Sequence, residues 1–430
     1  MKPNTSILIF LLIFLLNTFI IAGDANFNSA SRAKTLSLNG LYFAGADGLQ
    51  PVLGNPSTLS LLNSRGIEFF IIDHIGQHKF ENLQNNLFQS FQDDDFSFGG
   101  GAYWSFSHSF TAALSYQRAI DYKVSWPFTN LFSNDSSSSL LAFDFYNQIT
   151  IDAASASFAF KFDQVSVGGS ANFYYVAQHT SFPRSNERWN QGSGLAAYQF
   201  NYNLDGYSFG FNLGASFQVI DQIGAGIMTR SGYKVDLEGT AESSMFAQLD
   251  SSSSLVNLSG NFEMPWVFGG GIVYEWTDDL IINLDMQYNL WNGIQKTFDF
   301  TFDNSSWQQN LSSIDSLTTI TAASFTLSFD NSIDAGLGIE YKTSDLVLRT
   351  GYRFSQSPNT DDTYNMLFPS VDQHWVSIGI GYQKENLLID AAIAYAFGIA
   401  KEVMKPGIRN LSGSYSSTMI MPNVTIRYLL

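Results

Sequence analysis

The sequence predicts an all-β fold: a fourteen-stranded antiparallel transmembrane β-barrel with an N-terminal plug, or hatch, in its lumen. Three observations support this prediction. The amino terminus has the form of a secretory signal, strand-like alternation of apolar and polar residues fills much of the remaining chain, and short polar turns alternate with long polar loops.

Composition separates the chain from ordinary soluble enzymes. Only 14% of its 430 residues are charged, against about 25% in a typical soluble domain, whereas 15% are aromatic. The formal charge of −17 argues against nucleic acid as a partner, because phosphate recognition requires clustered Lys and Arg. The absence of Cys excludes disulfide scaffolds, thiolate metal sites and a lipid-modified amino-terminal cysteine.

Residues 1–23 are predicted to be a secretory signal peptide. Lys2 precedes an apolar run at 7–16, and two small residues, Ala22 and Gly23, close the segment. A membrane-spanning helix is the competing interpretation, but it needs about 20 apolar residues, and Asn17 and Thr18 interrupt this run. We therefore expect an exported protein.

Strict alternation predicts the strands. In residues 207–217 the odd positions are apolar and the even positions are Ser, Gly or Asn, and residues 282–290 alternate in the same way. Successive side chains of a strand point to opposite faces of the sheet. We therefore expect an apolar face toward lipid and a face of Ser, Asn and Gly toward the lumen.

The lengths of the connections favour a membrane barrel over a soluble sandwich. Six short turns are expected at Ser107-His108, Asp163-Gln164, Asp221-Gln222, Asp278-Asp279, Thr343-Ser344 and Glu385-Asn386. Seven longer polar stretches lie between them, near 79–97, 119–153, 181–205, 242–254, 302–320, 356–372 and 404–411. These connections join fourteen strands and leave both chain ends on the short-turn side, as in bacterial outer-membrane barrels.

Aromatic residues near both ends of the strands agree with this architecture. Three of them adjoin short turns and three lie toward the long loops: Trp276, Tyr341 and Tyr382, then Trp291, Tyr352 and Trp375. We expect these rings to form two girdles at the membrane interfaces. Core packing in a soluble β protein is the alternative for any one ring taken alone.

Residues 24–64 do not fit the strand scheme and are predicted to form the plug, with the barrel at 65–430. The segment combines several Gly and Pro residues with apolar residues such as Leu36, Leu41 and Phe43. A periplasmic extension is the alternative, but the segment is too apolar for a solvated tail.

The mature sequence resembles the FadL family (OmpP1/FadL/TodX-type) of outer-membrane transporters for long-chain fatty acids and hydrocarbons. Residues 28–33, 40–47 and 55–59 match the family's hatch, which has a Gly-rich start, an Ala-Asp pair and an Asn-Pro-Ala motif. Met264-Pro265 before Trp266 is a second match. The most specific match is 348–382, with its Arg-Thr-Gly strand, Ser-Pro loop and Pro-Ser-Val-Asp segment. Ser57 departs from the family's usual Ala, and the chain ends in Leu rather than in an aromatic residue.

This resemblance implies an outer-membrane channel for passive uptake of hydrophobic compounds, most of all long-chain fatty acids, with lateral release through a gap in the wall. We expect the plug to act as the gate, with four ligand or gate candidates: Phe27, Phe43, Asn55 and Pro56. The expected partners are the hydrophobic small molecule, outer-membrane lipid and lipopolysaccharide, with no nucleic acid. The protein is expected to be a monomer in the cell outer membrane of a Gram-negative-type bacterium.

Two other functions remain open on the same barrel. A general porin would need a charged, water-filled constriction and no apolar plug, whereas a surface adhesin or secretion shuttle would depend on the long loops. An enzyme is not expected, because the five His residues are scattered and no catalytic set emerges. No metal site or cofactor is predicted either, and the choice between fatty acid and aromatic hydrocarbon stays open.

Overall fold

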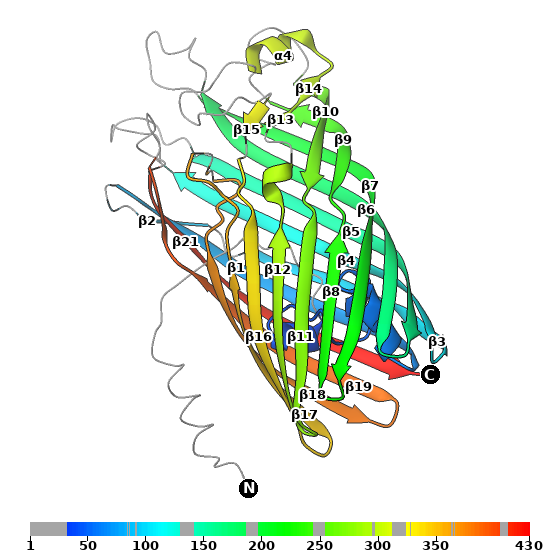
Figure 1. Ribbon diagram of the computed structural model, residues 1–430. Coiled ribbons are helices and arrows are strands. Elements are labelled where there is room, and N and C mark those ends of the chain that lie inside the picture. Colours follow the sequence, from blue (N-terminus) through cyan, green and yellow to red (C-terminus); the bar gives the residue numbers. More distant parts are fainter. Residues whose placement is uncertain are drawn as a thin grey trace, which may run out of the picture.

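The wall of the protein, described here from a computed structural model, is a closed antiparallel sheet (Figure 1). The structure describes residues 32–430 except 84, 86, 91–92, 130–141, 186–196, 244–253, 295–296, 312–323, 327, 363, 365 and 405–411. The sheet closes where β1 (Arg65–Asn82) pairs with β21 (Gly413–Leu429). Fourteen wall strands run through the described residues, so the predicted fold class is confirmed. The predicted signal at 1–23 lies outside the described residues.

Between β1 and β21 the wall strands follow one another in chain order. They are β3 (Asp93–Ser107), β4 (Phe110–Thr129), β5 (Ala142–Phe162), β6 (Val165–Ser185), β7 (Ala197–Ile220), β8 (Ile223–Arg230) continued by β9 (Tyr233–Glu242), β10 (Leu255–Met264) continued by β11 (Val267–Thr277), β12 (Leu280–Asn289), β16 (Ser332–Lys342), β17 (Leu346–Ser355), β18 (Gln373–Lys384) and β19 (Leu387–Gly398). Pro265, which has no N–H to donate, lies in the break between β10 and β11.

Shorter elements lie in the connections at the far end from the short turns. They are β2 (Leu87–Gln89), η4 (Trp291–Gly293), β13 (Thr297–Asp299), β14 (Thr301–Phe302), α4 (Ser305–Leu311), β15 (Ser324–Thr326) and β20 (Lys401–Val403). Within the described ranges, no helix has both the length and the apolar character needed to cross a membrane.

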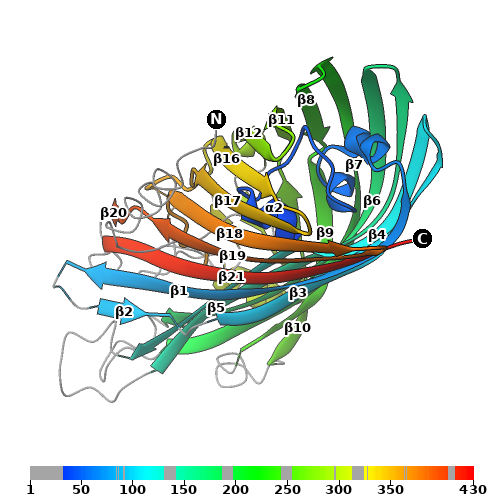
Figure 2. The same cartoon turned by 90° about the horizontal axis from the view of Figure 1, so that it is seen from below.

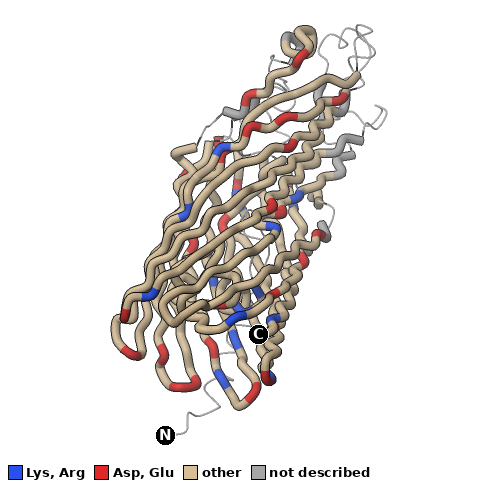
Figure 3. Tube along the Cα trace, turned by 90° about the vertical axis from the view of Figure 1, so that its right-hand side faces the viewer, with Lys and Arg blue, Asp and Glu red and all other residues tan. Residues whose placement is uncertain are grey.

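All six predicted short turns are present, at one end of the barrel. Both ends of the wall meet there, because the Leu430 N–H donates to the Arg65 carbonyl (3.0 Å). Acidic residues are frequent in these turns (Figure 3). They include Asp163, Asp221, Asp278, Asp279, Asp345 and Glu385.

At the other end the strands run further than predicted. β4 continues to Thr129 and β5 begins at Ala142, so much of the stretch 119–153 is strand and not loop. The stretch 181–205 is shortened in the same way by β6 and β7. Both stretches resemble loops in the sequence because their outward side chains are polar.

Strand β7 shows how the two ends of the wall differ. In residues 207–217 the outward side chains are apolar and the inward ones are Ser, Gly and Asn, as predicted. Beyond this run the even positions still point inward, but the polarity of the two faces is reversed. Phe200, Tyr202 and Leu204 are buried inside, whereas Asn203 and Asp205 are exposed outside. We call the part of the wall near the short turns the turn-side half, on β7 residues 206–220, and the other part the loop-side half, on β7 residues 197–205.

Strand β4 also changes from a polar to an apolar inner face, and it does so at a β-bulge. Its register against β5 shifts between Arg118 and Ile120, and one extra residue on a strand moves every later side chain to the other face. Before the bulge, Ser115 and Gln117 face inward; after it, Tyr122 and Trp126 do.

The predicted girdle toward the long loops is wrong for two of its three rings. Trp375 is buried on the inner face of β18, on the same side as Ser377, and the Arg353 guanidinium lies 4.4 Å from its ring centre. Trp291 is buried beside Phe329 after β12 ends. Alternation decides the first case, because Trp375 is an odd position in a strand whose even positions face outward. Tyr352 and the three rings near the short turns are exposed, as expected.

Residues 32–62 lie inside the turn-side half of the barrel (Figure 2). They form α2 (Ala33–Ser37), η1 (Gln50–Val52) and η2 (Pro56–Leu61), joined by irregular backbone. Helix α2 packs on β17, β18, β19 and β21, and η2 packs on β4 to β7 on the opposite wall. Nearly all residues of this N-terminal segment are buried, so it fills the lumen at this height.

Candidate functional site

Three of the four predicted site residues, Phe43, Asn55 and Pro56, lie close together in the N-terminal segment, and Phe27 lies outside the described residues. The Asn55 side-chain amide donates to the Phe43 carbonyl (2.7 Å) and to the Ala215 carbonyl of β7 (3.3 Å). Its oxygen accepts from the Ser57 N–H (3.2 Å) and so caps η2, in which Pro56 is the first residue. Asn55 therefore joins two parts of the segment to each other and to the wall.

Phe43, whose carbonyl accepts from Asn55, also contacts a second part of the wall. Its N–H donates to the Asp285 carboxylate of β12 (2.8 Å), and its side chain belongs to a small buried cluster with Leu41, Met228 and Val267. The side chain is 2% exposed. A gate at this position would have to break these contacts.

Glycines of three neighbouring strands let the N-terminal segment lie directly on the wall. A methyl group at Gly214 of β7 would overlap the Asn55 side chain, and one at Gly226 of β8 would overlap the Phe43 carbonyl. Gly168 of β6 makes the same kind of approach to the Pro56 backbone. Any larger residue at these positions would force the segment away from the wall.

Buried ion pairs hold the start of the segment. Arg32 pairs with Glu68 of β1 (2.9 Å), and Arg427 of β21 bridges Glu68 (2.8 Å) and Asp47 (2.6 Å). Burial alone would raise the pKa of Asp47, but the Arg427 guanidinium, together with Lys34 and Arg349, holds that pKa below its usual range. Removing one partner would leave an uncompensated buried charge, which makes the arrangement costly to disturb.

A second ion-pair group lies beside α2. Lys34 pairs with Glu340 of β16 (3.3 Å), and Arg349 of β17 joins Glu340 and Asp390 (2.6 Å to each). Burial by itself lowers the pKa of Lys34, but the Glu340 carboxylate, with smaller contributions from Tyr42 and Asp47, raises it by more, so the pKa is raised and Lys34 stays charged. These side chains border a cavity of about 630 Å³ that also reaches residues next to the short turns.

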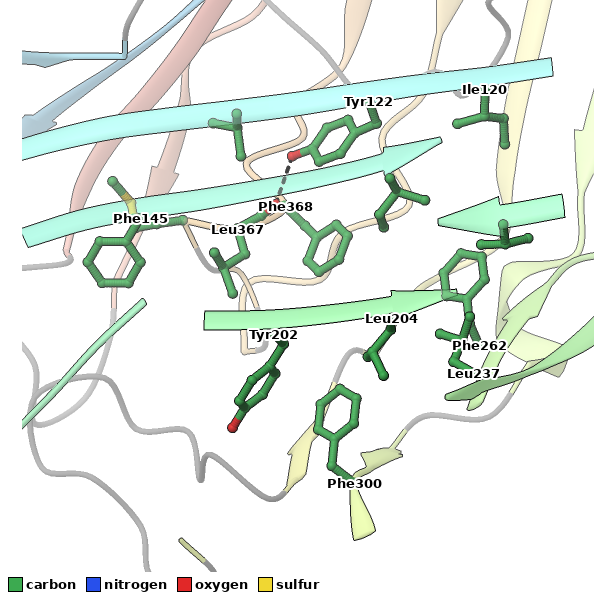
Figure 4. Packing of buried hydrophobic residues seen from close by; sticks show 14 of the residues in the cluster. Ile120, Tyr122, Phe145, Tyr202, Leu204, Leu237, Phe262, Phe300, Leu367 and Phe368 are labelled. Carbon is green, nitrogen blue, oxygen red and sulfur yellow. Dashed lines mark hydrogen bonds between the residues drawn. The ribbon is translucent and has the colours of Figure 1, made fainter. Parts of the chain in front are cut away.

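The loop-side half has an apolar interior. Buried side chains from β1, β4 to β7, β9 and β10 form one continuous cluster with parts of the outer connections (Figure 4). Its wall residues include Phe80, Ile120, Tyr122, Val124, Trp126, Phe145, Ile149, Ile151, Tyr174, Val176, Phe200, Tyr202, Leu204, Val235, Leu237, Val256, Leu258 and Phe262. An apolar surface that faces inward within a barrel can receive an apolar ligand.

The connection between β17 and β18 fills part of this interior. Its buried side chains belong to the same cluster: Tyr364, Met366, Leu367, Phe368 and Val371. The Phe368 ring stacks on the Tyr122 ring of β4 at 5.9 Å between centres (Figure 4). The N-terminal segment and the described part of this loop, residues 356–372 without 363 and 365, thus enter the lumen from opposite ends.

Side-chain contacts replace backbone hydrogen bonds along part of the boundary between β3 and β4. In the described residues their backbone ladder ends at the pair Gly99 and Gln117, although both strands continue toward the loops. Beyond that point side chains join the strands: the Ser97 hydroxyl donates to the Asp121 carboxylate (3.1 Å), and Lys123 pairs with Asp95 (3.2 Å). Side-chain contacts can separate without breaking a sheet ladder, so the wall can open here at a lower cost than where a backbone ladder joins the strands.

Sequence reasoning missed the ion pairs and the buried loop. A signal for the ion pairs exists, because Glu68, Arg349, Asp390 and Arg427 are charged residues at inward positions of strands in a charge-poor chain. The loop has a weaker signal in its apolar Met-Leu-Phe run. Among the residues that the structure describes, no three His, Asp or Glu side chains gather into a metal-binding group.

Comparison with known proteins agrees with this geometry. The family model described as outer membrane protein transport protein (OMPP1/FadL/TodX) matches residues 128–428. A FadL homologue of Pseudomonas aeruginosa has a similar structure, with a TM-score of 0.74 and 15% sequence identity over 95% of this chain and 99% of that chain.

Two further structures are similar. The P. putida toluene transporter TodX gives a TM-score of 0.70 at 15% identity over 93% of this chain and 98% of that chain. The Ralstonia pickettii toluene transporter TbuX gives a TM-score of 0.69 at 15% sequence identity over 94% of this chain and 99% of that chain. At this identity the structures establish a shared fold. No curated protein matches the chain in sequence.

Proposed function

The chain belongs to the outer membrane protein transport family (OMPP1/FadL/TodX), whose members are transport channels of the outer membrane, and on this premise we propose that it takes up hydrophobic compounds passively, with long-chain fatty acids as its substrates. We further propose that residues 1–23 direct export, that residues 24–64 form the gate, and that the channel works as a monomer among lipid and lipopolysaccharide.

The apolar interior of the loop-side half is the observation that carries this proposal. Each methylene group moved from water into such a surface contributes about 0.8 kcal/mol. A ligand with a long hydrocarbon chain is therefore captured with little specific polar chemistry. No external energy source is needed, since transfer into the membrane is downhill for such a molecule.

The proposed path leads from this interior to the membrane. The N-terminal segment closes the lumen on the turn side, so a ligand that does not pass it must leave through the wall. The β3–β4 seam, where side chains replace the backbone ladder, supports release at that height. Movement of the contact among Phe43, Asn55 and Pro56 would be the gating step, with Phe27 as a further candidate in the same segment.

The substrate class has two contenders. Two of the similar structures are named toluene transporters, which supports small aromatic hydrocarbons, whereas the resemblance of the sequence to the FadL family supports long-chain fatty acids. The porin alternative has less support, because the segment and the loop occupy the lumen that a porin would keep open. An adhesin or secretion shuttle would depend on the outer loops, so loop deletions that leave uptake unchanged but abolish partner binding would favour it.

Deleting residues 24–60 tests the proposal. Uptake of radiolabelled palmitic acid by cells that carry the variant should change severalfold, because the ion pairs and the Asn55 contacts that close the turn side are lost. Heat-modifiable gel mobility should stay normal, since the wall strands are untouched. Planar-bilayer conductance of the intact protein provides the control: steady high conductance would support a porin, and unchanged palmitate uptake with an intact barrel would remove the gate.

A further inference from the structure

Three hydrogen-bond donors of the inner wall converge on the loop at 356–372. The Tyr122 hydroxyl of β4 donates to the Leu367 carbonyl (2.9 Å), and the Asn147 side-chain amide of β5 donates to the same oxygen (3.1 Å). The Trp126 indole N–H donates to the neighbouring Met366 carbonyl (3.0 Å). We call Tyr122, Trp126 and Asn147 the donor seat; one of its hydrogen bonds is drawn in Figure 4.

The donor seat is held in place by its own surroundings. The Asn147 side-chain oxygen accepts from the Thr180 hydroxyl (2.8 Å), and the Gln178 amide donates to that hydroxyl (3.0 Å). With its oxygen engaged by Thr180, the Asn147 amide must turn its NH₂ group toward the lumen. Asn147 and Trp126 are fully buried, so both donors are fixed before any ligand arrives.

Apart from the buried His78 ring, whose centre lies 5.9 Å from that of Trp126, and the Thr180 and Gln178 side chains behind Asn147, apolar side chains surround the donor seat. Ile120, Val124, Phe145 and Ile149 belong to the same buried cluster and carry no side-chain polar atom. A buried donor without an acceptor is costly, so whatever occupies the seat must present oxygen acceptors there. The loop meets this demand with two adjacent carbonyl oxygens, flanked by the apolar side chains of Met366, Leu367 and Phe368.

The loop thus places two neighbouring oxygen acceptors on the donors and apolar side chains around them, and a carboxyl group on a hydrocarbon chain offers the same combination. We propose that the donor seat is the head-group site for a long-chain carboxylic acid, and that residues 366–371 occupy it as an internal ligand until the acid replaces them. The inference rests on the proposed uptake function and narrows its substrate class. A plain hydrocarbon that displaced the loop would remove the carbonyl acceptors of three buried hydrogen bonds and offer none in return, so the seat discriminates against it.

The double variant Tyr122→Phe with Asn147→Leu tests the seat in the full-length protein. Both changes keep much of the side-chain volume and remove two donors. Uptake of radiolabelled palmitic acid and of radiolabelled hexadecane is measured in Gram-negative cells that have no other channel of this family. The ratio of palmitic acid to hexadecane uptake should fall about tenfold or more, because the acid alone loses hydrogen bonds.

Two variants separate head-group recognition from loop release. Tyr174→Phe removes a buried hydroxyl elsewhere in the cluster, from a ring that stacks on Tyr233 at 4.2 Å, and should leave the ratio unchanged. Phe368→Ala loosens the loop but keeps all three donors, so uptake of both compounds should rise in parallel. Heat-modifiable mobility confirms barrel assembly for each variant.

Several outcomes would overturn the inference. An unchanged ratio in the assembled double variant, or an equal fall in Tyr174→Phe, would show that the seat does not read the head group. A wild-type protein that carries hexadecane but no palmitic acid would refute the seat and leave the channel function standing. A wild-type protein that carries neither compound would refute the channel function, and the seat with it.

Discussion

Apolar and polar residues alternate along the strands in both the turn-side and the loop-side half of the barrel, but the apolar face points outward in one half and inward in the other. In the turn-side half the outer face is apolar and the lumen is polar, filled by the N-terminal segment and its ion pairs. In the loop-side half the outer face is polar and the lumen is apolar. On β7 the change takes place around Gly206, within a single continuous strand.

The difference shows where the hydrocarbon of the membrane ends. The outward apolar run of β7, residues 207–217, matches the 9–11 residues or so that a tilted strand needs to cross the bilayer. Beyond it the wall stands in water, so apolar side chains gain by facing the lumen instead. The surface that could hold a hydrophobic ligand is therefore built outside the hydrocarbon layer, where such a ligand first arrives.

The largest expected effect is the difference in free energy of unfolding between two variants that place a charge on the outer face, one inside the lipid band and one beyond it. Phe209→Lys puts an ammonium into the lipid band, and we expect a loss of about 3 kcal/mol in the free energy of unfolding. Asn203→Lys, six residues away on the same face, should cost about 0–1 kcal/mol, because its side chain lies beyond that band. Urea unfolding in lipid vesicles measures both. Equal losses would place the membrane boundary elsewhere.

Acid should loosen the N-terminal segment but not the loop at 356–372. We expect this effect on stability to be smaller than that of Phe209→Lys. The pKa of Asp47 lies below its unfolded value of about 3.9, so its ion pair stabilises the protein above that pH. This contribution is lost as the pH falls through the lowered pKa, below about pH 4. The donor seat consists of uncharged groups and has no such dependence.

Spin labels can follow the two parts separately, since the chain has no Cys of its own. A nitroxide on Leu61→Cys should become more mobile below about pH 4, whereas one on Asp362→Cys should not. Asp47→Asn is the matched control and should reduce the response of the first label. Release of both labels at the same pH would argue that the two fillings of the lumen are not held independently.

The turn-side half was largely predictable from the sequence. Lipid imposes one rule on its outer face, so the alternation in 207–217 and the six short turns were enough to place strands and chain ends. Trp375 was misplaced only because its parity within β18 was not applied. In the loop-side half the sequence predicts loops, because a strand with lipid outside it would not carry polar outward residues such as Asn203 and Asp205.

The candidate site was predictable only where a local motif marks it. Asn55 and Pro56 form such a motif, and both lie where the N-terminal segment meets the wall. The donor seat has no local signature, because Tyr122 and Leu367 are 245 residues apart in the chain. Their contact depends on closure of the whole barrel, which no short stretch of sequence reveals.

Photo-crosslinking with a diazirine-bearing palmitic acid analogue tests the apolar interior most directly. The probe is added to cells that carry the protein, irradiated, and located by peptide mass mapping. We predict adducts on inward residues of the loop-side half, such as Ile149, Phe200 and Leu204. Adducts confined to outward residues of the turn-side half, such as Phe209 and Leu213, would contradict the proposal, because they would place the acid in the surrounding lipid and never inside the barrel.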